Sequence, residues 1–346
     1  MKFEPSPETF LVEEIAAYAP CGAGEHTFLW VEKHDLTTPE AVRRIARALR
    51  VADRDVGYAG MKDRHATTRQ WISVPRVAPE QALALSVDGL VIRAAARHGN
   101  KLRTGHLRGN RFEAILTDVS DADETVASQR LSALGREGLP NRYGDQRFGA
   151  AGDNAAAGLA LARGAEGGGE RGRGRGSGRG GRGGEPDRRH RRLLLSALQS
   201  AVFNRVLVLR AAPPGLRAVR AGDVLQKTDT GGLFITDDPA ADQARVDAGA
   251  VVPTGPLPGS RVLEPPDGTP ARALEDQALA DVGAARRDLE GMGRELPGTR
   301  RPVLVPVTID DPPTVRRGDR LTLRFSLPAG SYATVLLQAV LAESPC

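Results

Sequence analysis

A run of glycine and arginine near the middle of the chain limits the possible folds more than any other feature. Residues Gly164 to Gly184 are mostly of these two types, so the segment lacks the apolar side chains that a core needs. Helical patterns flank it at Asp153–Arg163 and Arg192–Arg210. We interpret it as a flexible connection between two helices and favour this over non-specific RNA binding. The 346 residues then form two domains, or one domain with a large insertion.

The positive charge of the chain is concentrated in the same region. The net charge is +5, and the ten arginines and four acids between Arg163 and Arg192 contribute +6, which leaves −1 for the remainder. The isoelectric point near 9.5 therefore does not establish a basic globular surface. Any nucleic-acid binding has to be argued from local groups of basic residues.

Several classes of protein are disfavoured by what the sequence lacks. The two cysteines, Cys21 and Cys346, form no disulfide framework or metal motif and favour a reducing cytoplasm. No apolar run reaches the roughly 20 residues of a membrane span, and the N-terminus is not a signal peptide. Motifs of phosphate-binding loops, dinucleotide-binding turns, zinc proteases and serine hydrolases are missing. We expect a cytoplasmic protein without a metal or an organic cofactor.

The stretch from Val56 to Trp71 places one acid, Asp63, among several cations. An apolar run broken by Gly57 and Gly60 leads into a polar segment, and a second apolar run follows. This pattern predicts a strand, a turn, a polar loop and a strand. Nearby cations would keep the carboxylate ionised, so that it could act as a nucleophile or a base. From these residues alone, a surface turn with a salt-bridged aspartate is favoured. The cations are Lys62, Arg64, His65 and Arg69.

Two later loops have compositions that suit RNA. The segment His98–Phe112 interleaves Lys101, Arg103, Arg108 and Arg111 with glycines and Asn110, as expected for contacts with a phosphate backbone. The segment Leu139–Gly149 combines aromatic residues with arginines, which can stack bases and hold phosphates. A solvated basic loop and an ordinary glycine-rich turn are equally good interpretations of these residues.

The remaining patterns predict a mixture of strands and helices. We expect Thr38 and Ser331 to act as N-caps of helices, and the segment Pro213–Pro270 to contain only short strands and turns. Strands are predicted at Glu8–Ile15, His26–Lys33, Leu90–Ala94, Phe112–Leu116, Val303–Ile309 and Leu321–Ser326, and helices at Thr38–Leu49, Pro79–Leu85, Asp121–Leu134, Leu274–Leu289 and after Ser331.

Taken together, these stretches resemble the TruD family of tRNA pseudouridine synthases. One such motif would be weak, but these occur in the family's order over most of the chain. The motifs are Phe10–Glu14; Gly24–His26; Gly57–Asp63; Lys101–Arg103 with Gly109–Phe112; Asn141–Gly149; Ser196–Ser200 with Phe203–Asn204; Pro253–Leu257; and Leu327–Thr334.

The resemblance implies an α+β fold with two parts. A catalytic pseudouridine synthase domain, with a mixed, mainly antiparallel sheet and helices, would be interrupted by a TruD-specific α+β insertion domain. We expect the catalytic domain at residues 1–138 and 301–346, and the insertion at residues 139–300. The flexible Gly/Arg-rich loop would occupy residues 164–190 of the insertion.

The resemblance also implies a reaction, the isomerisation of uridine 13 of certain tRNAs to pseudouridine. Asp63 matches the catalytic aspartate, which either attacks C1′ or removes the C2′ proton. The partner is tRNA, with no cofactor, membrane or protein partner implied. The target base must leave its stack, at a cost of a few kcal/mol. The implied substrate contacts are Phe10, Asn110, Phe112, Tyr332 and Phe325, and the candidates for phosphate contacts are Lys62, Lys101, Arg103 and Arg147.

The sequence departs from the family in a few places. A basic residue often precedes the Phe10 motif, but here Glu4 lies near that position, with Lys2 close by. Arg142 stands where an aromatic residue is usual. The alternatives are a catalytically inactive RNA-binding protein that retains the fold, and a hydrolase that uses Asp63. No second carboxylate or oxyanion-hole motif accompanies Asp63, which disfavours the hydrolase.

Overall fold

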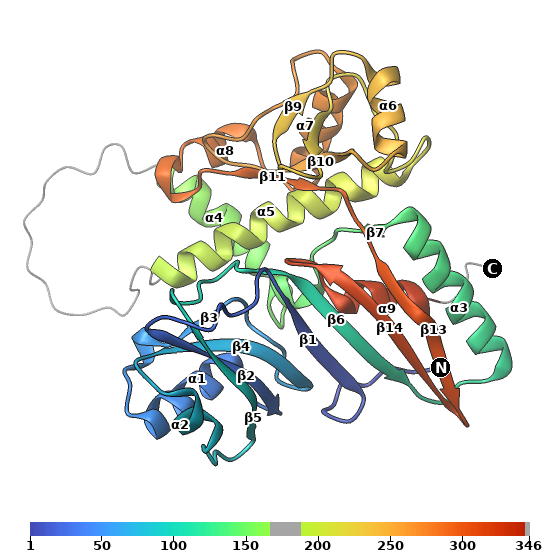
Figure 1. The fold of residues 1–346 in the computed structure, drawn as a ribbon. Coiled ribbons are helices and arrows are strands. Elements are labelled where there is room, and N and C mark those ends of the chain that lie inside the picture. The colour runs from blue at the N-terminus through green and yellow to red at the C-terminus, as the bar shows by residue number, and fades with distance from the viewer. Residues whose placement is uncertain (167–187, 343–346) are drawn as a thin grey trace, which may run out of the picture. The chain divides into compact units, whose positions relative to one another are not determined.

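The computed structural model describes residues 1–166 and 188–342, which fall into two compact units (Figure 1). Unit 1 comprises Met1–Leu139 and Pro306–Cys346, and unit 2 comprises Pro140–Val305. The second boundary lies later than the expected residue 300. Strand β11 (Thr299–Pro302) pairs within unit 2, and β12 (Leu304–Val305) pairs with β7 (Leu139–Pro140), so the chain returns to unit 1 only after β12.

Unit 1 is built on a mixed eight-stranded sheet with the order β13-β14-β6-β1-β4-β2-β5, and β3 pairs with β4. Strands β1 and β4 are parallel, and the other neighbours are antiparallel. The α+β class with a mainly antiparallel sheet is therefore confirmed. The strands are β1 (Phe10–Ala16), β2 (His26–His34), β3 (Gly57–Tyr58), β4 (Thr67–Pro75), β5 (Leu90–His98), β6 (Leu107–Leu116), β13 (Thr308–Arg317) and β14 (Arg320–Pro328).

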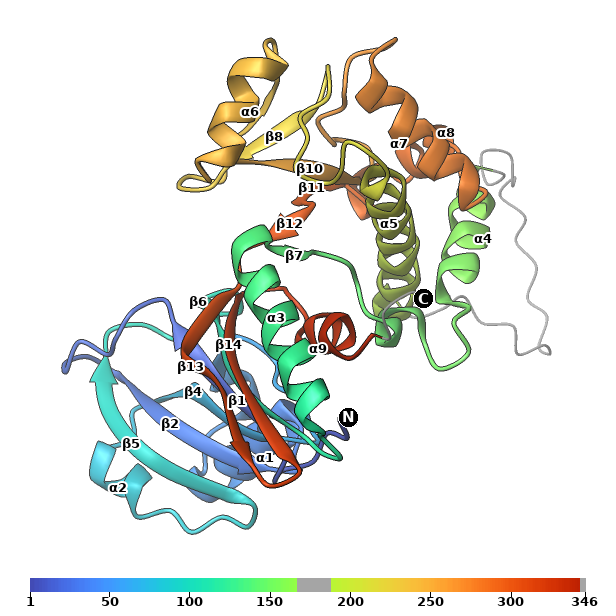
Figure 2. The same cartoon turned by 90° about the vertical axis from the view of Figure 1, so that its right-hand side faces the viewer.

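Helices lie along both halves of this sheet. Helices α1 (Thr38–Leu49) and α2 (Pro79–Leu83) lie beside β2, β4 and β5, whereas α3 (Asp121–Glu137) and α9 (Ala333–Leu341) lie beside β6, β13 and β14 (Figures 1 and 2). The sheet residues that pack with α1 alternate along each strand, for example Leu29 and Val31 on β2 and Ile72 and Val74 on β4. This period of two leaves the intervening side chains on the opposite face.

The N-caps of two helices differ from those predicted from the sequence. Helix α1 begins with a capping box between Thr37 and Glu40, so Thr37, and not Thr38, is the N-cap. The Thr38 hydroxyl instead donates to the side chain of Gln70 on β4. The N-cap of α9 is Tyr332, without a side-chain capping bond, so the expected cap at Ser331 is also wrong.

Unit 2 combines helices with a four-stranded antiparallel sheet of order β11-β10-β8-β9. The expected helix from Leu274 to Leu289 is two helices, because the chain turns through Gly283 in the left-handed region. Helix α6 lies inside the segment expected to hold only strands and turns. The remaining elements are α4 (Asn154–Glu166), α5 (Arg188–Ala211), β8 (Val224–Lys227), β9 (Leu233–Ile235), α6 (Pro239–Asp247), β10 (Val251–Leu257), α7 (Pro270–Asp281) and α8 (Arg286–Glu290).

The predicted loop at residues 164–190 overlaps both flanking helices. Residues 164–166 end α4 and residues 188–190 begin α5, while residues 167–187 lie outside the described residues. Among the described helices, α5 alone is long and apolar enough to cross a membrane by length and composition, and 56% of its apolar window is buried. A buried core helix passes the same test, so this is weak support for a membrane span.

Candidate active site

Asp63 lies in an exposed loop between β3 and β4 whose backbone is held by buried side chains. The backbone N–H of Lys62 donates to the Thr38 hydroxyl at 2.9 Å. The side-chain amide of Gln70 donates to the backbone carbonyl of Gly60 at 3.1 Å. The side chains of Thr38 and Gln70 are hydrogen-bonded to each other, and both residues are fully buried. The loop backbone is thus fixed by α1 and β4, while the Asp63 side chain is exposed.

A buried ion pair fixes the residue immediately before Asp63. The Lys62 ammonium lies 2.8 Å from the Glu14 carboxylate, and the two side chains are only 2% and 1% exposed. Burial raises the pKa of Glu14, and the ion pair with Lys62 opposes this shift. Lys62 therefore points into the sheet, away from solvent. This geometry contradicts its predicted contact with an RNA phosphate, because the ammonium is already buried against a carboxylate.

The cation that reaches the Asp63 residue itself is Lys33, near the end of β2. Its ammonium donates to the Asp63 carbonyl at 2.7 Å and also to the Leu36 carbonyl. The Lys33 side chain is fully buried. Burial lowers the pKa of Lys33 to about 8, and the negative charge of Asp63 opposes this shift. No local sequence pattern marks Lys33, because it lies thirty positions before Asp63.

The cations expected to surround Asp63 have other partners. Arg64 and His65 both lie within ion-pair distance of Asp35, at 3.5 and 3.2 Å. Arg69 contacts carboxylates on the opposite face of the sheet, Glu13 at 3.1 Å and Glu32 at 2.8 Å. Each of the four predicted cations, Lys62 included, therefore has a carboxylate partner other than Asp63. Arg69 lies in β4, where successive side chains point to opposite faces, so its nearness in sequence did not bring it to Asp63.

The basic loop after β5 packs against the start of the Asp63 loop. The Gly105 amide donates to the Ala59 carbonyl at 2.8 Å. A Cβ on Gly57 would lie 2.3 Å from the Leu102 carbonyl oxygen, so only glycine permits this approach. Gly60 needs no such freedom, because its nearest contacts would be ordinary, at 3.5 Å. Lys101 and Arg103 are consequently brought beside the loop that carries Asp63.

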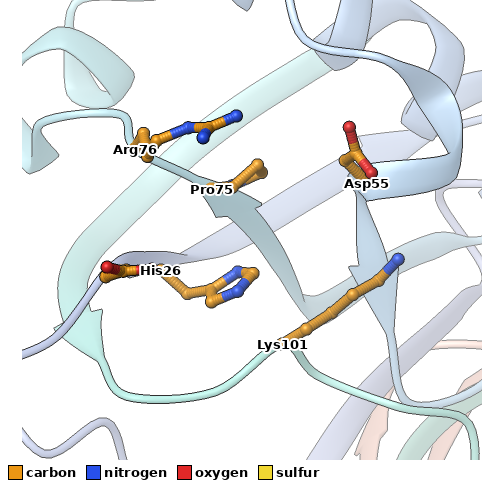
Figure 3. A pocket seen from close by; sticks show the side chains of 6 residues that line it. His26, Asp55, Pro75, Arg76 and Lys101 are labelled. Atoms are coloured by element: carbon orange, nitrogen blue, oxygen red, sulfur yellow. The ribbon is translucent and has the colours of Figure 1, made fainter.

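Lys101 also lines a hollow of about 320 Å³ in unit 1 (Figure 3). The hollow does not include Asp63. The Nδ1 atom of His26 is buried there without a hydrogen-bond partner. Burial lowers the pKa of His26, and the charge of Lys101 acts in the same direction. The lining residues are Glu25, His26, Asp55, Pro75, Arg76 and Lys101.

Asn110 lies in the sheet directly beside the buried ion pair. It is the register partner of Glu14 on β1 and of Leu327 on β14, so its side chain shares the face of Glu14. Its Oδ1 atom is buried without a hydrogen-bond partner, as is the hydroxyl of Ser331 in the turn after β14. Tyr332 follows that turn and is half-buried. A buried acceptor without a partner is costly, so Asn110 is a candidate for binding a substrate.

The three predicted phenylalanines form a stack on this same face. The ring centroids of Phe10 and Phe112 are 6.0 Å apart, and those of Phe112 and Phe325 are 5.3 Å apart. Phe10 and Phe112 are each 4% exposed, and Phe325 is 0% exposed. In this structure the rings contact one another and the core. A direct contact between Phe325 and a substrate would require its neighbours to move.

Arg147 lies in unit 2, in a loop whose aromatic side chain is enclosed by cations. Its guanidinium donates to the Ser200 hydroxyl at 3.2 Å and lies 5.4 Å from the Tyr143 ring centroid. Arg301 covers the same ring at 4.4 Å. The Asn204 side chain holds the Tyr143 backbone through both its amide and its carbonyl group. These contacts account for the composition of the loop without RNA.

Comparison with known proteins identifies the family. The sequence matches the family model described as tRNA pseudouridine synthase D (TruD) over residues 1–166 and 186–340. The chain belongs to the TruD family. It is 43% identical to a tRNA pseudouridine synthase D of Anaeromyxobacter sp. (strain Fw109-5), over 97% of this chain and 91% of that protein. It is 40% identical to a tRNA pseudouridine synthase D of Geobacter metallireducens, over 96% of this chain and 93% of that protein.

A solved structure shares the fold. The crystal structure of a putative TruD from Methanosarcina mazei matches with a TM-score of 0.73 at 21% identity, covering 97% of this chain and 92% of that one. The expected family and enzyme class, a tRNA pseudouridine synthase and thus an isomerase, are confirmed by the family matches.

Proposed function

We propose that this TruD-family enzyme isomerises uridine 13 of tRNA to pseudouridine, with Asp63 as the catalytic group. The glycosidic bond between N1 and C1′ breaks, the uracil rotates, and a bond forms between C5 and C1′ while C5 loses a proton and N1 takes one up. No atoms are gained or lost overall, so no redox cofactor is required. Asp63 either attacks C1′ or removes the C2′ proton, and both roles need the ionised carboxylate.

The observation that carries the proposal is the exposed Asp63 carboxylate on a loop with a buried framework. Catalytic groups need fixed geometry, and hydrogen bonds from surrounding residues supply it. Here the backbone on both sides of Asp63 is bonded by Thr38, Gln70 and Lys33. The loop therefore holds Asp63 in a fixed place while its side chain stays exposed.

The other proposed groups have supporting roles around the target nucleotide. Asn110, with its buried acceptor lacking a partner, would bind the extruded uracil, and Tyr332 and the Phe10–Phe112 stack would pack beside it. Phe325 would support that stack from behind. Lys101 and Arg103 would contact phosphates near the Asp63 loop. Arg147 would do so only if its bond to Ser200 opened.

The test is the mapping of pseudouridine in unmodified tRNA after incubation with the enzyme. We expect pseudouridine at position 13 and none in a tRNA with cytidine there. Binding without change would support the inactive RNA-binding alternative, and release of base would support a hydrolase. Asp63→Asn should lower turnover roughly 10⁴-fold or more with a Kd for tRNA within about threefold of the wild type. A comparable loss of both in a folded variant would count against the proposal.

A further inference from the structure

Lys33 is a buried cation that lies against the Asp63 loop without an ion-pair partner of its own. Its side chain is 1% exposed, and its ammonium donates to two backbone carbonyls, those of Asp63 and Leu36. Within residues 1–166 and 188–342, no carboxylate lies within ion-pair distance of it. The other buried lysine of unit 1, Lys62, differs in this respect, because its charge is neutralised by Glu14.

Placing an uncompensated charge in this position is costly for the fold. Burial opposes the charged form and lowers the pKa of Lys33 to about 8. Asp63 in the loop, Glu40 on α1 and Asp35 after β2 raise the pKa, and Lys62 in the loop lowers it. A methionine of similar volume would avoid the buried charge, but it would leave the carbonyls of Asp63 and Leu36 without this donor.

We propose that Lys33 is a positioning residue for Asp63: its ammonium fixes the carbonyl of that residue and places a positive charge beside the loop. This inference rests on the proposed catalytic role of Asp63. The bond to the carbonyl sets the direction in which the side chain leaves the loop. The charge matters once RNA covers the loop, because removal of water then opposes the carboxylate, and a cation in a site of low dielectric opposes that effect.

The first test measures the interaction between the two groups without activity. The side chain of Lys33 is titrated by NMR in the wild type, in Asp63→Asn and in Asp319→Asn, which removes an exposed acid elsewhere in unit 1. Because Asp63 raises the pKa of Lys33, we expect that pKa to fall in Asp63→Asn and to stay unchanged in Asp319→Asn. An unchanged value in Asp63→Asn would overturn the inference.

The second test separates positioning from general support of the fold. In Lys33→Met we expect kcat to fall roughly 10²-fold, while KM stays within about threefold of the wild-type value. We also expect the acid limb of the plot of kcat against pH to move to higher pH. Lys33→Arg, which keeps a positive charge, should retain the acid limb. Lys2→Met is the matched control, because Lys2 is exposed and pairs with Asp118. An equal loss at every pH would indicate a structural role and overturn the inference.

The two tests also distinguish this inference from the proposed function. Retained activity in Asp63→Asn overturns the proposed function, and the positioning role with it. An active wild type, an inactive Asp63→Asn and an unmoved Lys33 titration overturn the inference alone. If Lys33→Met does not fold, the titration of Lys33 in the variants that keep this lysine decides the question.

Discussion

The loop at Gly57–Ala66 in unit 1 and the loop at Asn141–Gly149 in unit 2 look alike in sequence, since both mix glycines, cations and an aromatic residue. The two loops differ in where their central side chains point. In the first loop, buried groups from other elements hold the backbone and Asp63 is exposed. In the second, the loop's own Tyr143 and Arg147 turn inward and contact Arg301 and Ser200.

This difference shows how to recognise a candidate site when composition does not. A loop that supports the fold directs its polar side chains to interior partners. A loop that supports chemistry keeps a reactive side chain exposed while its backbone is held in place. Other elements bond the backbone of both loops, and Asn204 does so in the second. The two loops differ in the exposure of their central side chain, because Asp63 is exposed whereas Tyr143 is buried. Variants in each unit can test whether the distinction holds.

The largest effect is expected from breaking the ion pair behind Asp63. Glu14→Gln leaves the Lys62 ammonium buried without a counter-charge, which costs about 3–5 kcal/mol of unfolding free energy. Because Lys62 adjoins Asp63, the loop should also lose its fixed geometry. We expect kcat to fall by roughly 10²-fold in the folded fraction. Denaturant unfolding and single-turnover pseudouridine formation would measure the two losses.

The matched variant breaks a buried ion pair of unit 2. Arg300 and Glu275 lie 2.6 Å apart, with side chains 1% and 5% exposed, so Glu275→Gln should destabilise the protein by a similar amount. We expect its turnover per folded molecule to stay within about twofold, because this pair holds no part of the Asp63 loop. Equal losses of turnover in the two variants would show that the proposed difference between the units is wrong.

The next largest effect is expected from filling the close contact between Gly57 and the Leu102 carbonyl. In Gly57→Ala the added Cβ would meet the backbone oxygen of Leu102 at 2.3 Å, which cannot move without shifting the basic loop. We expect a destabilisation of about 1–3 kcal/mol and a fall in kcat. In Gly60→Ala the nearest atoms would be 3.5 Å away, so this control should behave like the wild type. Loss of activity in both variants would implicate flexibility of the loop instead.

The sequence predicted the order of elements in unit 1 well, because strand alternation and proline at helix starts are local signals. The loop of Asp63 was correctly expected between two strands. The exact cap was not, because Thr37 and Thr38 are adjacent hydroxyls and only the position of Glu40 and Gln70 selects between them. Helix α6 was missed although Asp238 caps it and proline follows, since glycine-rich turns around it dominated the pattern.

The charge partners could not be predicted from the sequence, because they are set by the sheet register. Lys62 and Glu14 are 48 positions apart, and Lys33 and Asp63 are 30 apart. Local sequence suggested that the nearest cations would surround Asp63. Strand alternation instead directs Arg69 to the opposite face, where it meets Glu32. Nearness along the chain is a poor guide wherever a loop joins two strands.

A smaller effect is expected at the enclosed aromatic of unit 2. Tyr143→Leu removes a ring that is 7% exposed and contacted by Arg147 and Arg301, and should cost about 2 kcal/mol of stability. The Kd for tRNA should stay within about twofold of the wild type. Phe234→Leu is the control, because Arg245 covers a half-buried ring there. If Tyr143→Leu weakened tRNA binding tenfold without loss of stability, the ring would be stacking a base.

The smallest effect concerns charges on the other face of the unit 1 sheet. Burial raises the pKa of Glu32, but hydrogen bonds from Arg93 and Arg69 outweigh it and lower this pKa to about 2. Stability from this carboxylate is therefore present above pH 4.5 and is lost as pH falls from 4.5 to about 2. Because both arginines are partly exposed, we expect only about 1 kcal/mol.

Glu32→Gln should remove that acid-dependent part of the unfolding free energy, measured by denaturant unfolding at pH 6 and pH 3. Turnover at neutral pH should remain within about twofold, because Glu32 and Lys33 are neighbours in β2 and point to opposite faces. A loss of turnover as large as that expected for Lys33→Met would mean that charge on either face of the sheet acts on Asp63. The role assigned to the buried groups would then belong to the sheet as a whole.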